Sequence, residues 1–253
     1  VGKKYHIVDW DVSAAEKGGY AHFMFKEILE QPEAIRKTIS PRIRDGRIVL
    51  DDITLTADYA RNISRIYMVA CGSAYHAGIV GKYVWERLLR RPVEVVLVSE
   101  FRYSGPLVNG NTLVITISQS GETLDTMAAL REAKRLGGRT LAICNVVGSS
   151  IAREADDVLY TWAGPEIAVA TSKGYSTQLA ALVWVTVSYL IAVYATVRLG
   201  QPFPVVELSQ QAISSPSIYL KRKIQNMYSV CMSVLSVCLY LHHVHVRCLR
   251  RSE

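Results

Sequence analysis

The segment that decides the fold is Leu113-Val-Ile-Thr-Ile117, followed directly by Ser118-Gln-Ser-Gly-Glu-Thr123. Its first five residues are apolar or β-branched, which is typical of a buried strand. A helical pattern begins immediately after the polar turn, over residues 124–136, and ends at Gly137-Gly138. A strand that passes through a short turn into a helix is the building unit of a parallel α/β sheet.

The same rhythm repeats on both sides of this segment. Between most of the short apolar runs lie longer amphipathic stretches, the clearest of them at residues 74–90 and 124–136. Crossover helices at this spacing imply parallel strands covered on both faces. We therefore predict an α/β fold, a flavodoxin-like, doubly wound, five-stranded parallel sheet, with strands at residues 66–70, 93–98, 113–117, 140–144 and 158–160.

The flanks of this core differ from it in composition. Apolar positions keep helical spacing from Ala21 to about Thr38, and Pro32 interrupts them, which predicts two helical pieces there and a third helix near residues 52–62. We expect four parts in the chain: a linker (1–20), N-terminal helices (21–62), the α/β domain (63–211) and a divergent tail (212–253), and we expect the chain to be a piece of a longer protein.

Polar residues follow the apolar runs where a doubly wound sheet binds its ligands, outside the carboxyl ends of its strands. The turn at residues 118–123 offers hydroxyl groups, unpaired N–H groups at a helix start and the positive end of the helix dipole. These features suit a phosphate group. The alternative is that Ser120 or Thr123 only caps the helix.

Two further turns of this kind follow neighbouring strands. Cys71-Gly-Ser-Ala-Tyr-His76 again joins a strand to a helix, and Cys71 is either a wall residue or an activated thiol. Gly164-Pro-Glu-Ile-Ala-Val-Ala-Thr-Ser-Lys173 precedes a long helix that begins near Gly174, and its Lys173 either balances ligand charge or is a solvated cap residue. The three turns are expected to converge on one crevice.

Taken together, the three turns resemble the glutamine:fructose-6-phosphate amidotransferase (glucosamine-6-phosphate synthase) family. Further similar segments are His22-Phe-Met-Phe-Lys-Glu-Ile28, Ser99-Glu-Phe-Arg-Tyr103 and residues 141–157, and the similarity covers about residues 9–210. The turn at 118–123 alone indicates only the wider sugar isomerase (SIS) domain superfamily. Residues 73–74 and 171–175 depart from the family pattern but keep hydroxyl groups.

The resemblance implies a domain that binds fructose 6-phosphate or glucosamine 6-phosphate, in an aminotransferase (isomerizing) of hexosamine biosynthesis. It also implies that the glutaminase domain and the second SIS domain lie outside this chain, so we expect binding without full catalysis and assign no catalytic residue, not even Glu122 or Glu166. The implied substrate-binding residues are Cys71, Gly72, Ser73, Ser118, Gln119, Ser120, Thr123, Val169 and Thr171. The alternative is a stand-alone phosphosugar-sensing or assembly module.

The composition and net charge of the chain bear on which classes of molecule it binds. Half of the 253 residues are hydrophobic and 20% are charged, which predicts a globular chain. The net charge of +7 comes from scattered basic residues, so we expect no nucleic acid, and a phosphorylated small molecule is equally compatible with that charge. A homodimer, or association with the rest of a synthase, is the expected assembly, and the expected location is cytoplasmic, with no membrane partner.

The remaining signals concern metals and membranes. The five cysteines lack the paired spacing of zinc sites, and no cofactor or metal is expected; the alternative is metal binding by His242, His243, His245 and Cys248. The apolar stretches 179–197 and 230–246 raise the alternative of a membrane-associated remnant. We interpret the first as a core helix and the second as exposed apolar surface that pairs with another chain or aggregates.

Overall fold

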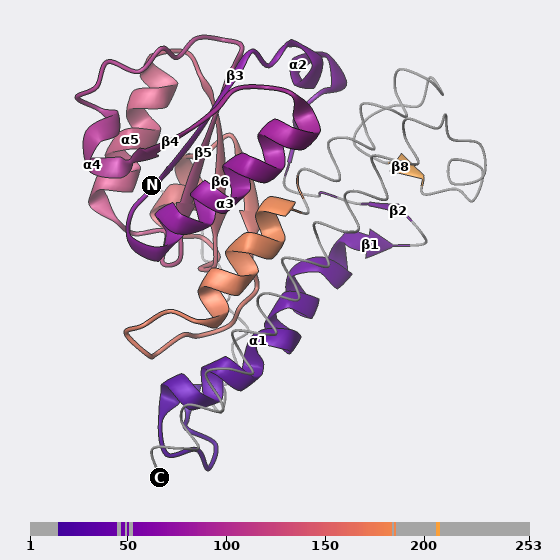
Figure 1. Cartoon of the computed structure of the whole chain (residues 1–253), viewed down its shortest axis with the longest axis vertical. Coiled ribbons are helices and arrows are strands. Elements are labelled where there is room, and N and C mark those ends of the chain that lie inside the picture. The colour runs from indigo at the N-terminus through magenta and orange to yellow at the C-terminus, as the bar shows by residue number, and fades with distance from the viewer. Residues whose placement is uncertain are drawn as a thin grey trace, which may run out of the picture. The chain divides into compact units, whose positions relative to one another are not determined.

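A computed structural model describes residues 15–44, 47–48, 50, 53–183, 185 and 206–207 of the chain. Its centre is a five-stranded, all-parallel sheet in the order β4-β3-β5-β6-β7 (Figure 1). This is the predicted doubly wound, flavodoxin-like arrangement, and all five predicted strands are confirmed. The strands are β3 (Arg65–Ala70), β4 (Val93–Leu97), β5 (Thr112–Ser118), β6 (Arg139–Cys144) and β7 (Asp157–Tyr160).

The strand order reverses between β3 and β5. The chain runs from β3 outward to β4 and then returns to the other side of β3 as β5. Met68 pairs with Ile115, and Val69 pairs with Thr116, so the carboxyl ends of β3 and β5 lie side by side. Every residue of β5 is buried, as expected for a central strand covered on both faces. The turns that follow β3 and β5 therefore meet at the switch point of the sheet.

Helices cover the two faces of the sheet. Tyr67, Val69 and Val114 pack with the α4 residues Val98 and Phe101 and with the α5 residues Ala129 and Ala133. A second cluster joins α5 and α6 to β6 through Leu130, Ile151 and Ala142. These helices are α4 (Val98–Phe101), α5 (Leu124–Arg135) and α6 (Ser150–Glu154). Because side chains alternate along a strand, Met68 faces the opposite side of the sheet.

The opposite face carries α3 (Gly72–Leu89) and the helix of residues 173–183. α3 packs against β3 and β4. Trp85 of α3 is buried, and its indole Nε1 donates a hydrogen bond to the carbonyl oxygen of Leu182 at 3.0 Å, which ties the two helices together. The helix that follows the third turn is thus part of the core.

The first helix, α1 (Phe23–Ile39), runs without a break through Pro32. The prediction of two separate helical pieces is wrong here. Proline lacks the N–H that would bond to the carbonyl oxygen of Ile28, four residues earlier. The side-chain amide of Gln31 donates to that same oxygen at 3.0 Å, which replaces the missing hydrogen bond. A local side chain therefore compensates for the proline, and the helix continues.

The third predicted helix is shorter than expected, α2 (Ala57–Asn62), with Thr56 as its N-cap. Between α1 and α2 the chain forms the 3₁₀ turn η2 (Ser40–Arg42) and then two short strands that the sequence analysis did not predict. β1 (Ile43–Arg44) and β2 (Arg47–Ile48) pair antiparallel, and β2 pairs with β8 (Val206–Glu207). Strands of two residues are too short to show the alternation from which strands are predicted.

Several predictions fall outside the described residues. Most of the predicted linker, the tail 212–253, the histidine cluster near residue 242 and the apolar stretch 230–246 lie there, as does most of stretch 179–197. None of the helices in the described part of the chain has the length and hydropathy needed to cross a bilayer. Within the same residues, no group of three or more His, Cys, Asp or Glu side chains could hold a metal ion. The predicted domain boundaries stay predictions.

Candidate functional site

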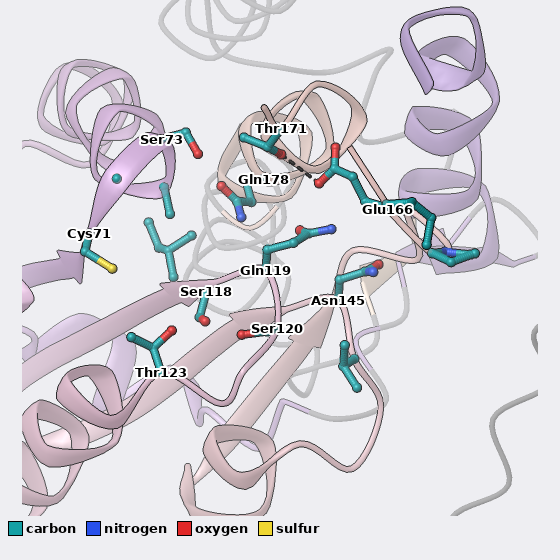
Figure 2. A pocket seen from close by; sticks show the side chains of 16 residues that line it. Cys71, Ser73, Ser118, Gln119, Ser120, Thr123, Asn145, Glu166, Thr171 and Gln178 are labelled. Atoms are coloured by element: carbon teal, nitrogen blue, oxygen red, sulfur yellow. Dashed lines mark hydrogen bonds between the residues drawn. The ribbon is translucent and has the colours of Figure 1, made fainter. Parts of the chain in front are cut away.

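A cavity of about 440 Å³ lies at the carboxyl ends of the strands (Figure 2). All three polar turns contribute to its wall, as does the helix of residues 173–183. The lining residues are Cys71, Gly72, Ser73, Ala74, Ile117, Ser118, Gln119, Ser120, Thr123, Asn145, Val146, Pro165, Glu166, Ile167, Thr171 and Gln178. The three turns, at residues 71–76, 118–123 and 164–173, are thus brought to one site by the parallel topology.

The cavity collects all of the expected binding residues except one. Cys71, Gly72 and Ser73 come from the first turn and the start of α3, and Thr171 comes from the third turn. Val169 is not a lining residue, and its side chain is fully exposed to solvent. A wall role for Cys71 agrees with its place in the lining and its exposed thiol.

The turn after β5 is held in shape by its own hydroxyl groups. The Oγ of Ser118 accepts the N–H of Gly121 at 3.1 Å, and the Oγ of Ser120 accepts the N–H of Glu122 at 3.3 Å. Gly121 has a φ of 68°, and a Cβ at this position would overlap the Ser149 side chain. Only glycine fits here, because the position requires both a left-handed backbone and close approach to Ser149.

The capping alternative for Thr123 does not agree with the geometry. Thr123 is the N-cap of α5 by position, yet its side chain makes no capping hydrogen bond. Thr123 is instead one of the residues that line the cavity. The first N–H groups of a helix have no partner within the helix, and the dipole makes that end positive. The wall next to Thr123 therefore combines hydroxyl groups with a helix N-terminus, which is the chemistry of an anion site.

Gln119 brings an unpaired carboxamide to the cavity. Both Oε1 and Nε2 of its side chain are buried, and neither has a hydrogen-bond partner among the described residues. A Cβ on Gly174 would lie 2.8 Å from Cδ of Gln119, so this amide packs directly against the first turn of the helix of residues 173–183. A buried polar group without a partner costs about 1–3 kcal/mol. A polar ligand in the cavity would remove that cost.

The third turn is organised by Glu166. Its Oε1 accepts the N–H groups of Ser172 at 2.9 Å and Gly174 at 3.1 Å, and its Oε2 accepts the hydroxyl of Thr171 at 2.7 Å (Figure 2). Three hydrogen bonds thus commit this carboxylate to the backbone and side chain of its own loop. Glu166 fixes the wall that carries Thr171.

Lys173 is buried and already paired with a carboxylate of α1. Its side chain is buried, with 3% of the residue exposed, and its Nζ lies 2.6 Å from Oε2 of Glu30 on α1. The solvated-cap alternative is wrong because the residue is buried, and the ammonium charge is already paired with Glu30. Among the described residues that line the cavity there is no lysine or arginine.

The α1 helix also holds the third turn through Glu27. This residue is 2% exposed, and its Oε1 accepts the N–H groups of Ile167 at 2.6 Å and Ala168 at 3.1 Å. Glu122, by contrast, does not line the cavity, and its Oε1 accepts the N–H of Ser150 at 2.8 Å. Hydrogen bonding to Ser150 lowers the pKa of the Glu122 carboxyl group.

Two polar lining residues were not found from the sequence. Asn145 follows β6, where the strand-end rule would have found it. Its Nδ2 donates to the carbonyl oxygen of Gly164 at 2.8 Å and its Oδ1 accepts the N–H of Ala163 at 2.7 Å, so it anchors the third turn. Gln178 lies inside a helix, where no local signal distinguishes it from a core residue.

The described site is thus a cavity at the switch point of a doubly wound sheet, lined by hydroxyl groups, carboxamides and a helix N-terminus. A family model for the SIS domain matches residues 60–188. The chain belongs to the SIS domain family.

Within the SIS domain family, the chain is similar to one group of enzymes. The chain is 62% identical over 180 residues to glutamine–fructose-6-phosphate aminotransferase (isomerizing) of Clostridium acetobutylicum, covering 71% of this chain and 30% of that protein. It is 60% identical over 201 residues to the protein of the same name from Caldanaerobacter subterraneus, covering 79% and 32%. This chain is therefore homologous to these aminotransferases and spans about a third of their length.

A solved structure agrees with this relationship. The C-terminal domain of glucosamine-fructose-6-phosphate aminotransferase from Francisella tularensis superposes with a TM-score of 0.66 at 42% identity, over 69% of this chain and 50% of that one. The match places the similarity in the C-terminal domain of that enzyme. The predicted SIS domain is confirmed, and the chain is homologous to the C-terminal part of the aminotransferases that it was expected to resemble.

Proposed function

We propose that this chain binds a hexose 6-phosphate, fructose 6-phosphate or glucosamine 6-phosphate, in the cavity at the carboxyl ends of β3 and β5. The observation that carries the proposal is the Gln119 carboxamide, which is buried in the cavity wall with both polar atoms unpaired among the described residues. Buried polar groups are normally paired, so an unpaired one in a cavity is a candidate ligand contact.

The phosphate group is proposed to lie against the turn that follows β5. Ser118, Ser120 and Thr123 surround this part of the cavity, next to the N-terminus of α5. Hydroxyl and N–H donors at a helix start suit a phosphate without a lysine or arginine. The residues proposed to contact the sugar phosphate from the other turns are Cys71, Gly72, Ser73 and Thr171, with Val169 only if its loop moves inward.

We further propose that the chain supplies the sugar-phosphate site of a glutamine–fructose-6-phosphate aminotransferase in hexosamine biosynthesis. The names of its relatives support this proposal. Glu166, the carboxylate that lines the described cavity, is engaged in three hydrogen bonds and is not free to act as a general base. The described residues are therefore proposed to bind the sugar phosphate without completing the reaction.

Assembly into a homodimer or with the rest of a synthase is part of the same proposal. The third turn exposes the apolar side chains of Ile167 and Val169 next to the cavity, with 49% and 105% of each residue exposed. Apolar side chains at the rim of a site suit contact with another protein surface. A cytoplasmic location stays a prediction.

The binding proposal is tested by titration calorimetry of the purified chain with fructose 6-phosphate and glucose 6-phosphate. Ser118→Ala and Thr123→Val each remove one hydroxyl group from the phosphate side of the cavity. Because a hydrogen bond to a charged group contributes about 1.5–3 kcal/mol, each variant is expected to weaken binding by at least about tenfold.

Thr126→Val is the matched control. Thr126 lies on α5, its Oγ1 is buried without a partner in the described structure, and it does not line the cavity. This variant is expected to bind like the unchanged chain. The absence of any heat with a folded chain contradicts the proposal, as does equal weakening by the control.

A further inference from the structure

Gln178 is a second carboxamide in the wall of the cavity. It lies on the helix of residues 173–183, only 2% of the residue is exposed, and its Oε1 is buried with no hydrogen-bond partner among the described residues. The other buried side-chain oxygens without a partner in the described structure belong to residues that do not line the cavity, namely Glu27, Thr116, Thr126 and Ser172. Among the residues with buried, unpaired side-chain atoms in the described structure, Gln178 and Gln119 are therefore the two that line the cavity.

The two carboxamides lie close together because of helix geometry. Gln119 packs against the backbone of Gly174, where a Cβ would lie 2.8 Å from its Oε1. Gln178 follows Gly174 by four residues on the same helix, and positions i and i+4 share one face. Figure 2 shows the Gln178 side chain extending from this helix toward Gln119 and into the cavity. The same wall of the cavity therefore carries both side chains.

The chemistry of the unpaired atoms indicates what part of a ligand they receive. A carbonyl oxygen such as Oε1 of Gln178 requires a hydrogen-bond donor. A phosphate dianion carries oxygen acceptors and no donor, so it cannot satisfy this atom. A sugar hydroxyl group both donates and accepts, and it can pair with either atom of a carboxamide.

We propose that Gln178, together with Gln119, recognises hydroxyl groups of the sugar, while the hydroxyl groups of Ser118, Ser120 and Thr123 hold the phosphate. This inference rests on the proposed function and assigns an orientation to the ligand in it. Gln178 becomes a specificity-determining residue: it selects for a polyhydroxylated phosphate ester over a phosphate ester that lacks hydroxyl groups. A site built to hydrogen-bond a hydroxyl group rejects a ligand without one because its own polar atoms stay unpaired.

The test compares two ligands that share a phosphate group. Fructose 6-phosphate carries sugar hydroxyl groups and methyl phosphate carries none. Gln178→Met keeps the length and volume of the side chain but removes the carboxamide. We expect this variant to bind fructose 6-phosphate about tenfold more weakly, the loss of about one hydrogen bond, and to bind methyl phosphate within twofold of the unchanged chain. Equal weakening for both ligands, or no weakening for either, overturns the inference.

A second variant covers the case in which Gln178→Met does not fold, as judged by circular dichroism. Gln178→Asn keeps a buried polar group and withdraws it by one methylene, and it is expected to show the same selective loss for fructose 6-phosphate. Thr126→Val again serves as the control that leaves both affinities unchanged. If the unchanged chain, correctly folded, binds neither ligand, the proposed function itself has failed. If it binds both and the Gln178 variants show no selectivity change, only the role of Gln178 has failed.

Discussion

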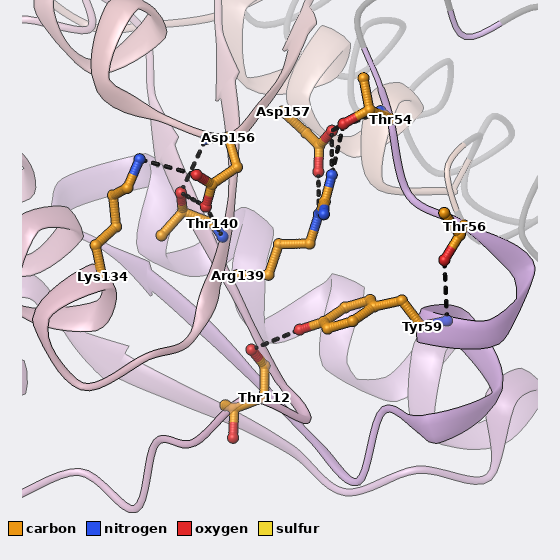
Figure 3. A network of polar contacts seen from close by, with 9 residues as sticks. All are labelled: Thr54, Thr56, Tyr59, Thr112, Lys134, Arg139, Thr140, Asp156 and Asp157. Carbon is orange, nitrogen blue, oxygen red and sulfur yellow. Dashed lines mark hydrogen bonds and ion pairs between the residues drawn. The ribbon is translucent and has the colours of Figure 1, made fainter.

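The two ends of the central sheet differ in whether buried polar side-chain atoms have hydrogen-bond partners. At the carboxyl ends, Gln119 and Gln178 bring unpaired polar atoms to the cavity wall. At the amino ends, polar side chains close around one another (Figure 3). Asp157, at the start of β7, is 1% exposed, and its carboxylate accepts hydrogen bonds from the backbone and hydroxyl of Thr54 and from two nitrogens of Arg139 at 2.6–3.1 Å.

The network at the amino ends extends across three strands. Lys134 and Asp156 form an ion pair at 2.8 Å, and Asp156 accepts the N–H and the hydroxyl of Thr140 at the start of β6. The hydroxyl of Tyr59 on α2 donates to the carbonyl oxygen of Thr112 at the start of β5 at 3.0 Å. These contacts tie the segment that precedes the sheet to its amino edge.

The comparison separates groups that stabilise the fold from groups that are available to a ligand. A hydrogen bond that is complete within the protein contributes to folding and has little left to offer a ligand. An unpaired buried group reduces stability, and a ligand that pairs with it recovers that free energy on binding. Substitutions at the amino edge should therefore change stability, and those at the Gln119 and Gln178 wall should change binding.

The largest effect is expected from Asp157→Ala. This change removes four hydrogen bonds at once and leaves the partly buried Arg139 guanidinium, with 25% of its side chain exposed, without its carboxylate. Breaking such a pair from one side should lower the free energy of unfolding by about 3–4 kcal/mol, measured by urea denaturation. The affinity of the folded chain for fructose 6-phosphate should stay within twofold of the unchanged chain.

Asp58→Ala is the matched control for this prediction. Asp58 also pairs with an arginine, Arg61, but 82% of its side chain is exposed. Exposed ion pairs contribute less than about 1 kcal/mol. If both variants lose the same stability, or if Asp157→Ala abolishes binding in a chain that is still folded, the division between the two ends of the sheet does not hold.

An intermediate loss of stability is expected from Glu27→Ala, which removes the hydrogen bonds between α1 and the third turn. The N–H groups of Ile167 and Ala168 lose their shared acceptor, at a cost of about 2 kcal/mol in unfolding free energy. Because this loop also carries Glu166 and Thr171, the affinity for fructose 6-phosphate should fall a few-fold, measured by calorimetry.

Glu27→Gln sharpens this prediction. A glutamine retains one carbonyl oxygen that can accept both N–H groups. The other carboxylate oxygen of Glu27 has no hydrogen-bond partner among the described residues, so its replacement by an amide removes no contact there. Stability within about 0.5 kcal/mol of the unchanged chain is expected for a substitution that keeps the contact. A loss as large as that of Glu27→Ala would show that the charge, and not the acceptor, holds the loop.

The smallest effect concerns pH and Asp156. Burial alone would raise the pKa of this carboxyl group, but hydrogen bonds from Lys134 and Thr140 outweigh burial and lower the pKa. A lowered folded-state pKa means that the carboxylate stabilises the fold above its unfolded pKa, near 3.9, and that this contribution is lost as the pH falls through the folded-state value. Asp156→Asn should therefore reduce the loss of stability below pH 4 by less than about 1 kcal/mol.

Urea denaturation at a series of pH values measures this difference. An Asp156→Asn variant that becomes more sensitive to acid than the unchanged chain would contradict the assignment, because it would mean that the carboxylate destabilises the fold.

The strands were predictable because each is a short apolar run in a parallel sheet, and the pattern is local to a few residues; the inner strands β3, β5 and β6 are buried almost throughout. The turn at 118–123 was predictable for the same reason, since it follows such a run directly. The continuous helix through Pro32 was not, because the compensation depends on where the Gln31 side chain points. The pairing of Lys173 with Glu30 joins residues 143 positions apart, which no local pattern reveals.

The sequence by itself determined the parallel sheet, the three turns at its carboxyl ends and the SIS family, because strand burial, turn chemistry and family similarity are all written in consecutive residues. Only the tertiary structure decided which side chains face the cavity with unpaired atoms. In the folded domain Val169 is exposed, Glu166 is hydrogen-bonded within its own loop, Lys173 is paired with Glu30 of α1, and Gln178 lines the same cavity as Gln119. Those outcomes depend on the packing of helices that are distant in sequence, and packing fixes them only when the whole domain has folded.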